Sequence, residues 1–148
     1  MTVRQIIHGP RFNLLVLSQS LAEQTILDKP YVMISITGSH QPQATLAQSD
    51  NLQDVLRLSF DDLARPTDGF TEPQKEDGMK VIDFTEKWKD KVKTIVVHCE
   101  AGRSRSAGIA AAISKVYNGD DMVFYKYYNP NSLAARVVKD AACDKGLV

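Results

Sequence analysis

The sequence is poor in cysteine, has no long apolar run, and carries no excess of charge of either sign. Its 148 residues include two cysteines, Cys99 and Cys143, which lie far apart and form no CxxC pair. A disulfide framework is therefore disfavoured, and we expect a reducing compartment in which a free thiol survives. Lys plus Arg and Asp plus Glu each total 18, so the charge balance predicts no binding to nucleic acid or to anionic membranes.

No segment near the start of the chain is suited to crossing a membrane. The longest apolar stretch there, residues 12–17, is much shorter than a bilayer span, and no typical signal-peptide cleavage pattern follows it. We therefore expect a cytoplasmic protein without membrane contacts, and a monomer. The length fits one domain, residues 1–148, that buries a core without disulfide or metal staples.

Four short runs rich in β-branched and apolar residues are typical of strands. Residues 94–97 are continuously apolar, as expected for a strand that is buried on both faces of a sheet. This run ends directly before His98 and Cys99. The other three predicted strands are residues 12–17, 31–36 and 52–60.

Three segments show the apolar spacing of helices, and each has a start or a stop. The first, residues 72–88, opens with a Thr-Glu-Pro start signal at residues 71–73. The second, residues 104–117, is rich in alanine and precedes an Asn-Gly stop. The third, residues 132–143, follows an Asn-Pro-Asn turn. Residues 38–50 are interpreted as a surface loop. Strands that alternate with helices predict a single α/β domain with a central, largely parallel sheet of four or five strands flanked by helices.

The segment from His98 to Ser106 carries the strongest chemical pattern in the chain. It reads His-Cys-Glu-Ala-Gly-Arg-Ser-Arg-Ser and connects the buried strand to the alanine-rich helix, at the end of the sheet where α/β folds bind ligands. The first N–H groups of a helix are unpaired and carry partial positive charge, so together they form a receptor for a phosphate dianion. The predicted substrate-binding residues are Glu100, Ala101, Gly102, Arg103, Ser104 and Arg105.

Within this predicted phosphate-binding loop, Cys99 has the position of a nucleophile. The helix dipole and the guanidinium of Arg105 favour the thiolate, which lowers the pKa of Cys99 below the unperturbed value of about 8.5. The planar fork of Arg105 fits two phosphate oxygens. The Ser106 hydroxyl can donate a hydrogen bond to the sulfur when it departs, and Gly102 suits a turn with positive φ or close backbone approach.

These nine residues resemble the Cys-x5-Arg-Ser/Thr signature of the protein tyrosine phosphatase superfamily and are most similar to its small dual-specificity branch. The order of the predicted elements extends the resemblance from about residue 31 to the C-terminus. The resemblance implies hydrolysis of phosphotyrosine, or of other phosphomonoesters, in a phosphorylated protein or peptide substrate through a phosphocysteine on Cys99. It implies neither a metal nor another cofactor. His98 resembles the family histidine that orders the loop and helps to set the pKa of the thiol.

Family members protonate the leaving oxygen with an aspartate from a separate loop. The turn that ends the third predicted strand supplies the candidates, with Asp62 first and Asp61 second. The segment between Asp62 and Cys99 is a few residues longer than usual for this branch, which leaves Asp68 as a third candidate. Without the cysteine loop, the two adjacent aspartates would be interpreted as a solvated turn or a helix cap.

The same residues leave alternative functions open. Arg103 resembles a basic residue that inositide phosphatases carry at this position, so hydrolysis of an inositide or an RNA 5′-phosphate is one alternative. Glu100 argues against a very highly charged head group. A catalytically silent module that binds phosphotyrosine is the second alternative. A rhodanese-type sulfurtransferase is the third, and the Arg105-Ser106 ending disfavours it.

The remaining reactive side chains have simpler interpretations. His98 is disfavoured as a metal ligand because no second ligand stands at zinc spacing. Cys143 is predicted to pack in the core or at the surface, with redox partnership to Cys99 as a minor alternative. The tyrosines between residues 125 and 128 are interpreted as ordinary half-buried packing, with stiffening of a loop as the alternative.

Overall fold

The computed structural model describes residues 5–148 and contains one parallel sheet of four strands. Its strand order is β1-β4-β2-β3, and all three neighbouring pairs are parallel. The predicted α/β fold is confirmed, and the sheet has four strands. The bounds are β1 Asn13–Ser18, β2 Tyr31–Thr37, β3 Leu52–Ser59 and β4 Thr94–Cys99.

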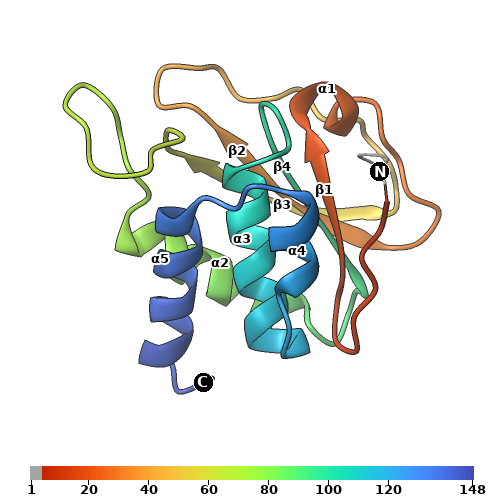
Figure 1. Cartoon of the computed structure of the whole chain (residues 1–148). Coiled ribbons are helices and arrows are strands. Elements are labelled where there is room, and N and C mark those ends of the chain that lie inside the picture. The colour runs from red at the N-terminus through yellow and green to blue at the C-terminus, as the bar shows by residue number, and fades with distance from the viewer. Residues whose placement is uncertain (1–4) are drawn as a thin grey trace.

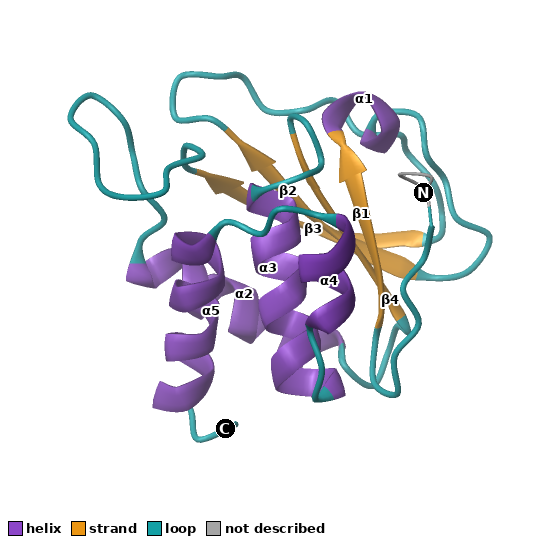
Figure 2. Ribbon diagram, in the orientation of Figure 1, coloured by secondary structure: helices purple, strands orange, loops and turns teal. Residues whose placement is uncertain are grey.

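The main helices all cover one face of the sheet (Figure 1), as the colouring by secondary structure also makes clear (Figure 2). The opposite face is covered by irregular segments, so its apolar cluster is smaller. Among residues 5–148, no helix combines the length and the apolar character that crossing a bilayer requires. The helices are α1 Gln19–Ala22, α2 Lys75–Trp88, α3 Arg105–Ile113, α4 Met122–Tyr127 and α5 Ser132–Asp144, with a π-helical turn at Ser114–Asn118.

Strand β4 lies in the middle of the sheet and is buried on both faces. Ile95 and Val97 belong to the cluster beneath the helices, whereas Val96 belongs to the cluster on the opposite face. All three side chains are fully buried, and each such burial contributes about 1.5–3 kcal/mol to folding. The continuous apolar run therefore fixes the strand that delivers Cys99 to the edge of the sheet.

Helix α5 packs closely against α2 and α3 because both neighbours present glycine at the contact. A Cβ on Gly78 of α2 would lie 1.9 Å from the carbonyl oxygen of Val137, and one on Gly108 of α3 would lie 2.5 Å from that of Asn131. Neither distance is compatible with a side chain. The beginning of α5 is thereby pressed against the helix that follows the cysteine loop.

One predicted helix bound is wrong by three residues, and another predicted helix changes its type before its predicted end. Helix α2 begins at Lys75, three residues after the predicted start, because Gln74 caps it and its N–H donates to the Asp77 carboxylate at 2.7 Å. Helix α3 changes to the π-helical turn after Ile113, and Gly119, with a φ of +83°, ends it where a stop was predicted.

The tyrosine cluster is a second correction. It lies in the short helix α4, which the sequence analysis did not predict. Tyr125 and Tyr127 are 52% and 47% exposed, which agrees with the prediction of half-buried side chains. Tyr128 alone packs against the main core.

Candidate active site

The four strands end at the same edge of the sheet, and their following loops gather there (Figure 1). A recess of about 470 Å³ opens between these loops. The recess is lined after β2 by Gly38, His40 and Gln41, after β3 by residues 61–63 and Phe70, and after β4 by Glu100 and Arg105. The structure therefore brings together the two segments that the sequence analysis singled out.

The backbone of the cysteine loop directs carbonyl groups outward and N–H groups inward. The carbonyl oxygens of Glu100, Arg103 and Ser104 accept hydrogen bonds from backbone groups outside the loop. Across a trans peptide the N–H points opposite to the carbonyl, so the three following N–H groups point toward the interior of the loop. An anion bound in the loop would therefore meet these three donors. The outside donors are the N–H groups of Gln19, Asn129 and Asn131, at 3.1, 2.9 and 2.9 Å.

The Cys99 thiol points into this loop and is only 2% exposed. Its Sγ accepts a hydrogen bond from the N–H of Gly102 at 3.3 Å and lies 3.1 Å from Oγ of Ser106. Burial by itself raises the pKa of the thiol, but the Ser106 and Gly102 hydrogen bonds and the charge of Arg105 outweigh burial, and the pKa is lowered. The sulfur is therefore poised to ionise.

Arg105 is the first residue of α3, and its side chain reaches the end of β3. The residue is 7% exposed, lines the recess, and donates from Nη1 to the carbonyl oxygen of Phe60 at 3.0 Å. That bond orients the guanidinium plane beside the recess. A guanidinium held in this way presents its remaining N–H groups to an anion without first having to be ordered.

Gly102 allows the loop to close over the sulfur. Its φ is +70°, and a Cβ there would lie 2.5 Å from the backbone nitrogen of Ser18 at the end of β1. Both conformation and space require glycine at this position. The sequence analysis named positive φ and close backbone approach as alternative reasons for this glycine, and both are found at Gly102.

His98 is fully buried beneath the loop. One ring nitrogen, Nε2, lies 2.6 Å from Oγ of Ser35, and the other, Nδ1, lies 3.3 Å from the Cys99 carbonyl oxygen. Burial lowers the pKa of His98, so the ring is neutral at ordinary pH. Sequence analysis missed Ser35, which faces His98 only because β2 and β4 pair in this register.

The two adjacent aspartates after β3 have different surroundings. The Asp61 carboxylate accepts hydrogen bonds from the Thr71 N–H (2.8 Å) and from the N–H and hydroxyl of Ser39 (3.1 and 2.7 Å). The bonds from Thr71 and Ser39 lower the pKa of Asp61. An aspartate kept ionised in this way is a poor proton donor. Asp61 instead closes the loop of residues 61–71, since its own N–H donates to the Thr71 carbonyl at 2.7 Å.

Asp62 lies at the wall of the recess and is held differently. Its Oδ1 accepts hydrogen bonds from Oγ of Ser104 at 2.7 Å and from Nδ2 of Asn131 at 2.8 Å. Asp68, the third candidate, is exposed and lies outside the lining of the recess. Of the three predicted candidates, Asp62 has the position that suits proton transfer to a group bound at the loop.

The rim of the recess has a mixed character. Phe70 contributes an aromatic ring that is 59% exposed. Glu100 is exposed at the same rim and accepts a hydrogen bond from Gln41 at 3.5 Å. Arg103 is exposed as well, but it does not line this recess. The rim therefore suits an aromatic group better than a cluster of negative charges.

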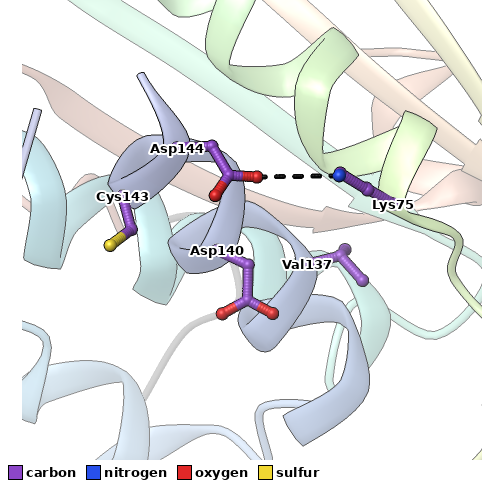
Figure 3. Close-up of a pocket in the computed structure, with 5 residues that line it drawn as sticks. All are labelled: Lys75, Val137, Asp140, Cys143 and Asp144. Carbon is purple, nitrogen blue, oxygen red and sulfur yellow. Dashed lines mark ion pairs between the residues drawn. The ribbon is translucent and has the colours of Figure 1, made fainter. Parts of the chain in front are cut away.

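Cys143 lies in a separate pocket of about 340 Å³ between the start of α2 and the end of α5 (Figure 3). The thiol is exposed, and the neighbouring side chains include an ion pair between Lys75 and Asp144 at 3.8 Å. Its predicted place in a late helix, at the surface, agrees with the structure. Within residues 5–148, no group of three or more His, Cys, Asp or Glu side chains is arranged to hold a metal ion.

A parallel sheet whose central strand ends in a cysteine loop, followed at once by a helix, is the fold of the cysteine-dependent phosphatases of the dual-specificity type. The fold expected from the resemblance in the loop is thereby confirmed. No protein-family model matches the sequence, and no curated protein matches it.

Three solved structures are similar over most of the chain. A mouse putative dual specificity phosphatase solved with zinc tungstate is 14% identical, with a TM-score of 0.67 and coverage of 99% of this chain and 93% of that one. Human DUSP28 is 17% identical, with a TM-score of 0.64 and coverage of 97% and 98%. The human tyrosine phosphatase-like serine/threonine/tyrosine-interacting protein is 18% identical, with a TM-score of 0.64 and coverage of 89% and 92%.

Proposed function

We propose that this protein is a cysteine-dependent phosphatase that hydrolyses phosphotyrosine in protein or peptide substrates. The observation that carries the proposal is the Cys99 sulfur, which accepts a hydrogen bond from the Gly102 N–H and lies against the Ser106 hydroxyl within a loop of inward N–H groups. A thiolate and an anion receptor coincide there. This combination is what attack on a phosphate dianion requires.

The proposed reaction has two steps. The Cys99 thiolate attacks phosphorus, the bond to the tyrosine oxygen breaks, and Asp62 gives its proton to that oxygen. Water then attacks the phosphocysteine, the Asp62 carboxylate takes a proton from it, and inorganic phosphate leaves as the sulfur–phosphorus bond breaks. Arg105 and the loop N–H groups stabilise the equatorial oxygens in both steps, and Ser106 donates to the departing sulfur.

The rim favours an aryl phosphate over a multiply charged head group. Phe70 offers a ring face to the phenol ring of a substrate, and aromatic pairs of this kind are worth about 0.5–1.5 kcal/mol beyond area burial. The carboxylates of Asp61 and Glu100 stand around the same recess and repel additional phosphates. These observations support phosphotyrosine and argue against the inositide alternative.

The test is a substrate panel under fixed conditions. Hydrolysis of para-nitrophenyl phosphate is expected to persist with a chelator present and to be inhibited by vanadate. A phosphotyrosine peptide is expected to be hydrolysed faster than phosphoserine peptides, inositides or an RNA 5′-phosphate. Tight phosphopeptide binding without hydrolysis would favour the silent binding module, and sulfur transfer from thiosulfate would favour the rhodanese-type alternative.

Asp62→Asn is expected to slow the reaction according to the leaving group. With a phosphotyrosine peptide, whose phenol leaves poorly, kcat/KM falls about 10²–10³-fold, because the proton donor is lost. With a strongly activated aryl phosphate, whose leaving group needs no proton, kcat/KM falls less than about tenfold. Steady-state kcat/KM, which reports the steps up to departure of the phenol, measures the difference across a series of substituted phenyl phosphates.

Matched variants of the other aspartates decide the assignment. Asp61→Asn and Asp68→Asn are expected to lack this leaving-group dependence. If either of them showed it in place of Asp62→Asn, the role of proton donor would belong to that residue.

A further inference from the structure

The Asp62 carboxylate is held through one oxygen only. Both of its hydrogen bonds, from Ser104 and from Asn131, end on Oδ1. Asp62 stands between two hollows: the recess that Arg105 lines, and a second hollow of about 360 Å³ that Ser104 and Asn131 line. With Oδ1 engaged by groups of the second hollow, Oδ2 is the oxygen that remains to carry the proton.

Asn131 joins three parts of the protein through one buried side chain. It is 6% exposed, and its Nδ2 donates to the Leu63 carbonyl as well as to Asp62, each at 2.8 Å. Its Oδ1 accepts from the N–H of Ala134 at 2.9 Å and so caps α5. Its own N–H donates to the Ser104 carbonyl at 2.9 Å.

The orientation of the Asn131 amide is fixed by these partners. Nδ2 faces two acceptors and Oδ1 faces one donor, so an amide turned by half a rotation would place like groups against each other on both sides. The close approach of Gly108 to the Asn131 backbone holds the residue at a fixed place on α3. The amide therefore has one position and one direction.

We propose that Ser104 and Asn131 are positioning residues for the proton donor, and that they hold Asp62 at the wall of the recess before substrate binds. The docking of α5 on α3 thereby sets the geometry of proton transfer. This inference rests on the proposed function, since it assigns Asp62 as the donor. Neither residue contacts the reacting atoms through the side-chain groups that hold Asp62.

The first test is Asn131→Ser. Serine is a good N-cap, so α5 keeps an acceptor for the Ala134 N–H, but its short side chain does not reach Asp62. With a phosphotyrosine peptide, kcat/KM is expected to fall about 10- to 100-fold, because small misplacements of a reacting group are this costly. With a strongly activated aryl phosphate the loss is expected to be less than about threefold.

Two comparisons separate positioning from general destabilisation. In an Asp62→Asn background, Asn131→Ser is expected to lower kcat/KM no further, because both changes act on one proton transfer. Asn118→Ser is the matched control. Asn118 accepts hydrogen bonds from the backbone N–H groups of Arg11 and Phe12, just before the start of β1, and this end of the strand lies away from the cysteine loop. The control variant is expected to lower the melting temperature without changing the dependence on leaving group. A loss of kcat/KM that is equal for all leaving groups, or that persists in the Asp62→Asn background, overturns the proposal.

A second readout needs no turnover. The ¹⁵N relaxation order parameters of residues 62–64 are expected near 0.85 in the unaltered protein and below about 0.6 in Asn131→Ser, with no such change in Asn118→Ser. Unchanged order parameters in Asn131→Ser overturn the inference even if the enzyme is active. Should the unaltered protein hydrolyse none of the substrates, the proposed function fails, and the order parameters still decide whether Asn131 holds Asp62.

Discussion

Cys99→Ser is expected to abolish turnover, with kcat falling by at least about 10⁴-fold, while the protein remains folded and still binds phosphate. The hydroxyl of serine stays protonated at pH values where this thiol ionises, so the nucleophile is lost. The substitution replaces one small atom that is almost fully buried, and the Gly102 N–H keeps an acceptor. Single-turnover kinetics with a phosphotyrosine peptide measures the loss, and calorimetry measures the fold.

The chain offers a matched control for this experiment. Cys143→Ser makes the same change at an exposed thiol in the separate pocket at α5, and it is expected to leave kcat unchanged. Equal activity of Cys99→Ser and the unaltered protein would refute a covalent intermediate on Cys99. A large loss in Cys143→Ser would show that the second thiol has a role that its surroundings do not suggest.

Arg105→Ala is expected to lower kcat/KM by about 10³-fold or more, because kcat falls and KM rises. Its guanidinium lines the recess, and in the proposed reaction it binds the phosphate of the substrate and stabilises the transition state. The charge also helps to lower the pKa of Cys99, so its loss leaves less thiolate at neutral pH. Kinetics as a function of pH, together with vanadate binding, separates these contributions.

Arg105→Lys tests whether charge alone suffices. Lysine keeps the cation but lacks the planar fork that bonds the Phe60 carbonyl and two phosphate oxygens at once. We expect kcat/KM of Arg105→Lys to exceed that of Arg105→Ala by less than about tenfold. An Arg105→Lys variant as active as the unaltered protein would contradict the bidentate role.

Residues close together in the chain made much of the site predictable. The proposed nucleophile Cys99, Arg105 and the inward N–H groups all lie within residues 98–106, so one local pattern contains them. The strands were predictable for a similar reason, because β4 is apolar at every buried position from Ile95 to Val97. Burial on both faces of a sheet leaves a continuous apolar run that needs no knowledge of the partners.

The remaining parts depend on contacts between distant residues. Asn131 and Asp62 are 69 positions apart, and Ser35 and His98 are 63 apart, so no local pattern marks either pair. The choice between Asp61 and Asp62 depends on Thr71, which returns to the end of β3 after a loop. Helix α4 is too short to show a helical period in the sequence. Strand register and loop closure decide these features.

The most direct test of the account is the titration of Cys99 itself. In a Cys143→Ser protein, Cys99 is the only cysteine, and the ultraviolet absorbance of its thiolate can be followed against pH with a Cys99→Ser, Cys143→Ser protein as the blank. The account predicts a midpoint below the value of about 8.5 for an unperturbed thiol, moving upward in Arg105→Ala. A midpoint at or above that value, unaffected by Arg105→Ala, would contradict it.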